Sequence, residues 1–478
     1  MPRRTTRLAL LTLLLLVLLS AFTRRYLIPA TSMACGYSAK IMATAVFAAG
    51  RDPNSVRTID LAGGSLKPLE MFTSPSINHD NQSATTSALG GLVKRTAQYH
   101  PTHGVTLLPR HTPPSSSSLT LSFDEPPLTF SPSRPTTFPI DQAINRSSDQ
   151  PNILSSIVTE AFTDPNPKKP RRTRALLIIH NNQIVAEKYG SGFNADSRLP
   201  GWSMTKSVFN ALVGILIHQN KLSLEDAALL PEWTDSPNDP RARITLNQLL
   251  HMSSGLEFDE NYANPLSDVT TMLFRKGNTS TFASHKPLLF APGDHWSYSS
   301  GTTNIISRFI RLTLADDPTY HAFPKEELFT PLGMTTAVVE RDYAGNFVAS
   351  SFMIATARDW ARFGLLFLND GIAPDGTRLL PQGWTQYSRA PAPADPYNRY
   401  AAHFWLRLRP LGENPNQYPS SHLPPDTFHM AGHEGQFITL IPSENLLILR
   451  LGLSRYPKTW NQEVFAGKVV QALSQSHE

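Results

Sequence analysis

The sequence predicts an α/β fold of the α+β kind, in which an antiparallel sheet is flanked by helices and joined to a helical subdomain, with an N-terminal extension before it. Two observations carry this prediction. Apolar, strand-like runs joined by short turns stand near residue 180 and again near residue 443, and segments with apolar residues at helical spacing fill the region from Ser203 to about Leu332. Strands from both ends of one domain are therefore expected to form a single sheet.

The first strand pair is expected at 176–179 and 184–189, joined across Asn181-Asn182. Asparagine tolerates the left-handed backbone that tight hairpin turns require. These strands should join the two later strands near the C-terminus, and a helix over 462–473 should cover one face of the sheet.

A buried helix is expected from Ser203 to His218, with Asn220 as its stop. The apolar residues that recur at a spacing suited to one buried face are Val208, Leu212, Ile215 and Leu216. A core helix explains these residues. It does not explain Lys206, a lysine in the buried first turn.

Ser203 and Lys206 form a Ser-x-x-Lys pair at the start of this helix. Residues i and i+3 lie on one helix face with Cβ atoms about 5 to 6 Å apart, so the hydroxyl and the amine can share a hydrogen bond. A deprotonated amine can activate the hydroxyl, and a helix N-terminus favours the negative charge that develops. The pair predicts covalent acyl transfer, although most isolated pairs of this kind lie on solvated helix faces.

Tyr298 lies on an expected loop just before another helix-patterned segment. A tyrosine beside a lysine ammonium can have its pKa lowered towards the range of a general base. The alternative interpretation is a packed ring whose hydroxyl has an ordinary hydrogen-bond partner.

The third segment of interest is a β-hairpin expected at 437–441 and 446–451, preceded by His433 and Gly435. Glycine at 435 would allow close approach of a backbone, and a strand-edge N–H there could form half of an oxyanion hole, with the N–H of Ser203 as the other half. A single histidine in a hairpin is more often structural, and His433 is open to that interpretation as well.

With these three segments in order, the chain resembles the penicillin-binding-protein-like and class C β-lactamase-related serine hydrolases, in particular the branch with esterases and 6-aminohexanoate-dimer hydrolases. Ser203-Met204-Thr205-Lys206 resembles the family's S-x-x-K, Tyr298-Ser299-Ser300 its Y-x-[NS], and His433-Glu434-Gly435 its K-T-G or H-x-G element. The segment 249–256 also looks like a family segment at a helix end near the active site. The resemblance extends from about residue 150 to the end and implies a β-lactamase/transpeptidase-like fold.

The resemblance implies a role for each matching residue. Ser203 would be the nucleophile, Lys206 and Tyr298 its acid/base partners, and His433 an electrostatic or hydrogen-bonding aid. The backbone N–H groups of Ser203 and Gln436 would hold the oxyanion.

Two departures from the β-lactamase pattern bear on the substrate. Ser300 stands where the β-lactamases carry asparagine, and His433 where they carry lysine. The groups that would bind a β-lactam amide and carboxylate are therefore missing, and the pattern is closer to that of esterases and amidases.

A competing mechanism uses a Ser-His-Asp triad, because Ser203, Asp294 and His433 occur in the α/β-hydrolase order. No alternation of parallel strands and helices precedes Ser203, and Thr205 replaces the last glycine of the Gly-x-Ser-x-Gly elbow. A His-Glu-x-x-His zinc motif fails because position 437 is Phe. We therefore expect no metal and no cofactor.

The N-terminus indicates export. A basic start is followed by an apolar run of 15 residues, Leu8–Phe22, which is typical of a signal peptide or a signal anchor over 1–25. Ser32-Met33-Ala34 is a passable cleavage site, so cleaved and membrane-attached forms both stay open. The catalytic part is expected outside the cytoplasm, either periplasmic or anchored to the inner membrane.

Residues 26–150 are expected to form an accessory region that ends in a Pro/Ser-rich linker, and 151–478 the hydrolase domain. The net charge of +5 comes locally from a basic run at 168–174, which is interpreted first as a solvated loop, with a phospholipid or cell-wall contact as the alternative. Nucleic acid is not expected as a partner, because no aromatic interleaving or binding motif accompanies the basic residues. Cys35 is the only cysteine, so no intrachain disulfide can form.

Two hypotheses of different class follow. The first is an exported serine hydrolase that cleaves a small ester or amide through an acyl-enzyme on Ser203. The second is a catalytically silent protein that binds cell-wall peptide or a protein partner through the same cleft. A buried ionisable cluster is costly without a use, which favours the enzyme.

Overall fold

The computed structural model describes residues 2–63, 73–110, 153–227, 229–236, 238–408, 423–456 and 458–475. The chain forms two compact units. Unit 1 comprises Met1–Pro101, Val105–Thr120 and Asp259–Asn278, and unit 2 comprises Thr102–Gly104, Leu121–Phe258 and Thr279–Glu478. The segment Asp259–Asn278 therefore belongs to the unit of the N-terminal region, although the sequence places it inside the expected hydrolase domain. The expected Pro/Ser-rich linker lies outside the described residues.

Unit 2 is built on a five-stranded antiparallel sheet with the order β10-β11-β12-β5-β6. Its strands are β5 (Thr173–His180), β6 (Gln183–Tyr189), β10 (Phe428–Gly432), β11 (Gln436–Ile441) and β12 (Leu446–Gly452). Both predicted hairpins are confirmed, and Asn181 and Asn182 have the positive φ values of 51° and 58° that the first turn requires. The edge strand β10 is an addition that the sequence did not reveal.

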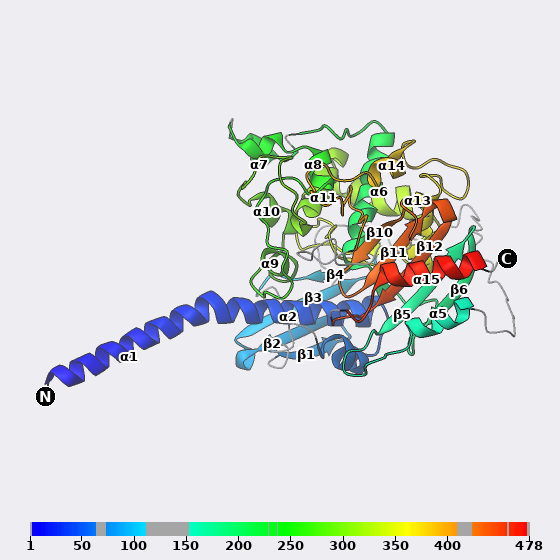
Figure 1. Cartoon of the computed structure of the whole chain (residues 1–478). Helices are drawn as coiled ribbons and strands as arrows, with labels where there is room; N and C mark the ends of the chain where they lie inside the picture. Colours follow the sequence, from blue (N-terminus) through cyan, green and yellow to red (C-terminus); the bar gives the residue numbers. More distant parts are fainter. Residues whose placement is uncertain are drawn as a thin grey trace. The chain divides into compact units, whose positions relative to one another are not determined.

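Helices cover both faces of this sheet (Figure 1). On one face, Leu176 and Ile448 share a buried apolar cluster with α5 (Ile153–Ala161) and α15 (Gln462–Gln475). Leu447 points to the other face and packs against Gly364 of α13 (Ala357–Leu368), where an added Cβ would lie 2.6 Å from Leu447 Cδ1. Because side chains alternate along a strand, one strand thus supplies core residues to both layers.

The helices of unit 2 between Ser203 and Leu332 form the predicted helical subdomain, α14 follows later in the chain, and the unit also contains a small sheet. The helices are α6 (Thr205–His218), α7 (Pro231–Thr234), α8 (Leu246–Leu250), α10 (Thr279–Ser284), α11 (Ser300–Leu314), α12 (Asp317–Pro324) and α14 (Trp384–Ser388). The small sheet has the order β7-β9-β8, with β7 at Leu199–Pro200, β8 at Val338–Val339 and β9 at Met353–Ala355.

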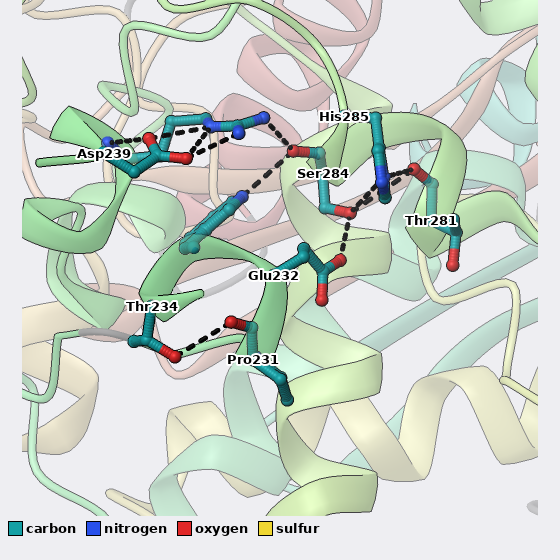
Figure 2. Close-up of polar contacts among 9 residues, drawn as sticks. Pro231, Glu232, Thr234, Asp239, Thr281, Ser284 and His285 are labelled. Atoms are coloured by element: carbon teal, nitrogen blue, oxygen red, sulfur yellow. Dashed lines mark hydrogen bonds and ion pairs between the residues drawn. The ribbon is translucent and has the colours of Figure 1, made fainter. Parts of the chain in front are cut away.

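A polar network joins α7 to α10 within the subdomain (Figure 2). The Ser284 hydroxyl donates to Glu232 Oε1 at 2.6 Å, and the indole N–H of Trp233 donates to the Ser284 carbonyl at 3.0 Å. Glu232 also accepts from Arg308 of α11 at 3.0 Å. The network lowers the pKa of Glu232 below its ordinary value despite burial, so an ion pair fixes these short helices in place.

Unit 1 packs helix α2 (Ile28–Ala43) against a four-stranded sheet with the order β1-β2-β3-β4. The strands are β1 (Thr73–Asn78), β2 (Ser83–Ala88), β3 (Val93–His100) and β4 (Gly104–Leu107). Helix α9 (Asp268–Arg275) packs on α2, and the rings of Tyr37 and Phe274 meet edge to face at 5.2 Å.

Helix α1 (Pro2–Phe22) precedes α2 and is continuous with it through a π-helical turn at Thr23–Leu27. Figure 1 draws α1 as the long blue helix at the N-terminus. The helical stretch Leu10–Ala48 is long and apolar enough to cross a membrane by length and composition.

Candidate active site

Ser203 lies in a 3₁₀ turn at Trp202–Met204 that leads directly into α6. The expected helix thus starts two residues later than the sequence suggested. Strand β7 places the turn, because the Gly201 N–H donates to the Met353 carbonyl of β9 at 3.0 Å. Trp202 holds a φ of 50°, which is unusual for a bulky residue. Such backbone strain persists only where the surrounding structure fixes it, and here the buried Trp202 ring packs against Phe352 and His433.

Lys206 connects Ser203 to two distant parts of the chain. Its Nζ donates to Ser203 Oγ at 3.1 Å, to Ser300 Oγ at 3.1 Å and to the Ser350 carbonyl at 3.0 Å. The side chain is only 1% exposed. The sequence prediction that Ser203 and Lys206 share a hydrogen bond is confirmed, and Ser300 joins them.

Tyr298 lies at the same centre, just before α11. The Lys206 Nζ is 4.9 Å from the centroid of the Tyr298 ring. The Ser299 side chain caps α11 by accepting hydrogen bonds from the N–H groups of Gly301 and Thr302. The cap fixes the start of the helix, and with it the positions of the two neighbours of Ser299, Tyr298 and Ser300.

Aromatic packing orients the Tyr298 ring. Tyr400 meets it edge to face at 5.5 Å, and Trp405 lies at 5.2 Å with an interplanar angle of 32°. The segment 249–256 supports the same loop from the end of α8. Met252 accepts the Ser297 N–H through its carbonyl and contacts the Ser299 N–H and the Thr302 hydroxyl through its sulfur. This segment therefore lies where the sequence resemblance places it, next to the candidate site.

Two residues of the site gave no signal in the sequence. His403 is buried, and its Nδ1 lies 2.8 Å from the Lys206 carbonyl while its Nε2 lies 3.2 Å from the Thr303 hydroxyl. A carbonyl only accepts, so Nδ1 carries the proton and Nε2 accepts from Thr303. Burial lowers the pKa of His403 to about 3, and the charge of Lys206 contributes in the same direction. His403 is thus neutral at ordinary pH and holds the backbone of the first turn of α6.

Ser350 is the second such residue, and it contributes its backbone. Its carbonyl accepts from Lys206, and the loop that carries it is fixed by Asn304 of α11. The Ser350 N–H donates to Asn304 Oδ1 at 3.2 Å, and Asn304 Nδ2 donates to Ser350 Oγ at 3.2 Å. This carbonyl directs the lysine amine towards the two serine hydroxyls.

The third predicted segment also reaches Ser203, but through a different glycine. At Gly432, the last residue of β10, an added Cβ would lie 2.1 Å from the Gly201 carbonyl oxygen. Gly435 instead lies against Arg450 and Ser454 and has a φ of 88°. The close backbone approach expected at Gly435 is therefore found at Gly432, and Gly435 serves the turn between β10 and β11.

The strand register bears on which N–H group faces the serine. His429 exchanges both backbone hydrogen bonds with Trp405, at 2.7 and 2.8 Å, on the side of β10 away from β11. Because these directions alternate along a strand, the pair Gly432–Gln436 is hydrogen bonded inside the hairpin. The N–H of Gln436 then points to β10, which argues against its expected role in an oxyanion hole. The alternation places the next outward N–H after Gly432 at His433.

The Gln436 side chain has a structural position. It is buried, with Nε2 donating to the Gly452 carbonyl at 2.8 Å and to the His433 carbonyl at 3.0 Å. The Gly452 N–H returns a bond to Gln436 Oε1 at 2.9 Å. The side chain therefore joins the end of β12 to the turn that carries His433.

The His433 side chain is partly buried and lies edge to face on Trp202 at 5.3 Å. Burial lowers its pKa, and the charges that act on it are those of Glu434, which opposes the shift, and Arg455, which adds to it. Asp294 is exposed in a loop after α10, and the hydroxyl of Ser203 accepts from Lys206. This geometry supports the Ser-Lys arrangement over a Ser-His-Asp triad.

The antiparallel sheet with helices on both faces is a β-lactamase/transpeptidase-like fold. The chain belongs to the Beta-lactamase family, whose model matches residues 159–461. A curated relative, the 6-aminohexanoate-dimer hydrolase of Paenarthrobacter ureafaciens, is 27% identical over 229 residues, which are 45% of this chain and 56% of the relative. The match thus spans little more than half of that relative's length.

Solved structures show the same fold at low sequence identity. A Bacteroides dorei protein described as a β-lactamase aligns with a TM-score of 0.53 and 19% sequence identity. The alignment covers 67% of this chain and 98% of that protein. EstCE1, a hydrolase with promiscuous acyltransferase activity, aligns with a TM-score of 0.52 and 12% identity over 67% and 97% of the two chains. The expected family and fold are confirmed.

Proposed function

We propose that this protein is a serine hydrolase that cleaves an ester or amide bond through an acyl-enzyme on Ser203. The observation that carries the proposal is the buried Lys206 amine, which bonds to the Ser203 hydroxyl at 3.1 Å at the start of α6. A nucleophile within hydrogen-bond reach of a base that is itself oriented by further groups is the arrangement that covalent catalysis requires.

Proton transfer from Ser203 is assigned to Lys206. When the amine is neutral, its two N–H groups donate to Ser300 Oγ and to the Ser350 carbonyl, and its lone pair faces the Ser203 O–H. Ser203 then attacks the substrate carbonyl, the proton passes to Lys206, and the hydroxyl of Tyr298, whose ring lies against the amine, delivers a proton to the leaving group. In the second half of the cycle the same pair removes a proton from water, which releases the acid and restores Ser203.

The developing oxyanion is assigned to two backbone donors. One is the N–H of Ser203, and the other is the N–H of His433, which follows the glycine that lies against the nucleophile's turn. This choice replaces Gln436 in the sequence-based expectation. It rests on the alternation of backbone donors along β10.

The substrate is expected to be a small ester or linear amide. Ser300 occupies the position where an asparagine would bind a β-lactam amide, and its hydroxyl is engaged with Lys206. The similarity to a 6-aminohexanoate-dimer hydrolase, whose substrate contains a linear amide, supports the same class. An exported enzyme with its catalytic unit outside the cytoplasm remains part of the proposal, on the evidence of the N-terminal apolar run.

The first experiment is the intact mass of the detergent-solubilised full chain after incubation with a fluorophosphonate probe. We expect a single adduct that is absent in Ser203→Ala and retained in Ser474→Ala, a matched change at an exposed serine of α15. Lys206→Ala should lose the adduct and His433→Ala should keep it.

Other outcomes contradict the proposal in distinct ways. An adduct that is lost in His433→Ala but kept in Lys206→Ala would indicate the Ser-His-Asp triad. No adduct on the folded wild type would favour the catalytically silent binding protein. Hydrolysis rates for a p-nitrophenyl ester, a linear amide dimer and a chromogenic cephalosporin then assign the substrate class, and preference for the cephalosporin would contradict the assignment to an ester or linear amide.

A further inference from the structure

The N-terminal helix changes its surroundings abruptly along its length. From Leu10 to Phe22 the large apolar side chains of α1 are 54–66% exposed on every face of the helix. The sequence holds no charged residue between Arg7 and Arg24. A helix that is apolar all round requires an apolar environment, and α1 has none within unit 1.

Helix α2, which continues the same helix, is a core element of unit 1. Thirteen of its sixteen residues are buried, from Ala30 onward. Cys35 packs with Ala88 and Val93 of the sheet, and Lys40 Nζ donates to the Val105 carbonyl at 2.6 Å. At Gly36 an added Cβ would lie 2.0 Å from the Phe274 carbonyl oxygen, so helices α2 and α9 are in backbone contact.

These observations bear on the cleavage site that the sequence offers after Ala34. Ala34 and Cys35 are both 0% exposed, and the peptide bond between them lies in the middle of α2. Cleavage there would take Ala30 to Ala34 out of the core of unit 1 and would leave Cys35 as a chain end inside it. A folded unit 1 is therefore incompatible with loss of the segment up to Ala34.

We propose that α1 is retained in the mature protein and anchors it by insertion into a lipid bilayer. The apolar run Leu8–Phe22 measures about 22 Å as a helix, and arginines at both ends can extend their charged groups to the headgroups of a membrane whose hydrocarbon core is about 30 Å thick. The run from Arg24 to Leu27 then marks the water interface, and unit 1 begins at α2. This proposal does not depend on the chemistry assigned to Ser203.

The test uses the full chain produced in a Gram-negative host. The intact mass of the purified protein should include α1, and the protein should stay in the membrane pellet after carbonate extraction and leave it with detergent. Purified protein should float with vesicles of phosphatidylethanolamine and phosphatidylglycerol. A mature N-terminus at any position from Thr23 to Ala43 would overturn the proposal.

Two single substitutions test whether membrane binding depends on α1 or on exposed apolar residues elsewhere. Leu14→Asp, in the middle of α1, should reduce the fraction that floats with vesicles by tenfold or more, because a carboxylate at the centre of a membrane helix is strongly disfavoured. Leu92→Asp is the matched control, since Leu92 is 78% exposed on unit 1 outside the helix, and it should float like wild type. Equal flotation of Leu14→Asp and wild type would overturn the proposal. So would a detergent-free dimer that does not float, which would indicate that a second copy covers α1.

Discussion

The amine of Lys206 and the hydroxyl of Ser203 lie 3.1 Å apart at the start of α6. The pair is local in sequence, but two further bonds of the amine reach Ser300 and Ser350, which are 94 and 144 residues away. Three separate parts of the chain thus determine where one buried amine points. Such an arrangement fixes the direction of proton transfer, because a buried lysine with several oriented partners has few other rotamers open to it.

Lys206→Ala should lower the rate of acyl-enzyme formation by about 10² to 10⁴, the usual contribution of a positioned general base. Acylation is measured by stopped-flow with a fluorophosphonate or by the burst of a p-nitrophenyl ester. Lys221→Ala, at an exposed lysine, is the control and should react like wild type. Equal acylation rates for Lys206→Ala and wild type would remove Lys206 from the mechanism.

Tyr298→Phe should lower kcat by about 10² while leaving the melting temperature within a few degrees, because the ring contacts with Tyr400 and Trp405 are kept and only the hydroxyl is lost. Steady-state ester hydrolysis and thermal unfolding are the two measurements. Tyr397→Phe, at a tyrosine that is 54% exposed, is the matched control. A kcat for Tyr298→Phe within twofold of wild type would leave this tyrosine a packing role only.

Gly432→Ala should abolish most of the activity. The added Cβ would meet the Gly201 carbonyl at 2.1 Å and would push β10 away from the turn that holds Ser203. Gly467→Ala in α15 meets nothing within 4 Å and should raise stability by about 0.5 to 1 kcal/mol through helix propensity. Hydrolysis rate and denaturant unfolding are compared for both variants, and a fully active Gly432→Ala enzyme would show that the strand need not approach so closely.

His403 makes stability depend on pH in a defined direction. Its pKa is lowered to about 3 by burial, whereas an unfolded histidine titrates near its ordinary value of 6.5. Between these values the unfolded state binds one proton more than the folded state, so the free energy of unfolding falls as pH decreases through this window.

His403→Gln tests this pH dependence. Its amide can still donate to the Lys206 carbonyl and accept from Thr303, but it does not titrate. The slope of unfolding free energy against pH from 6 to 4 should be smaller than that of wild type by up to about 1.4 kcal/mol per pH unit, the equivalent of one proton. Urea unfolding at several pH values measures it. Parallel slopes for variant and wild type would show that His403 is accessible to protons in the folded state.

The sequence by itself determined the local features of this protein. The spacing of Ser203 and Lys206 places two side chains on one helix face whatever the rest of the chain does. The Asn181-Asn182 turn likewise specifies its hairpin through backbone preference. The apolar run of α1 could also be recognised from the sequence, because a helix of this composition requires an apolar environment.

Only the tertiary structure decided which distant groups meet. His403 reaches Lys206 across 197 residues, and a lone histidine carries no pattern that reveals such a contact. Strand β10 was missed because it is only five residues long, and its position beside Trp405 and Gly201 is decided by tertiary contacts. For the same reason Gly432, and not Gly435, lies against the nucleophile's turn, since strand register sets which backbone atoms face an edge. Burial of α2, which distinguishes a retained anchor from a cleaved signal, also arises from packing against a sheet 40 to 70 residues further along the chain.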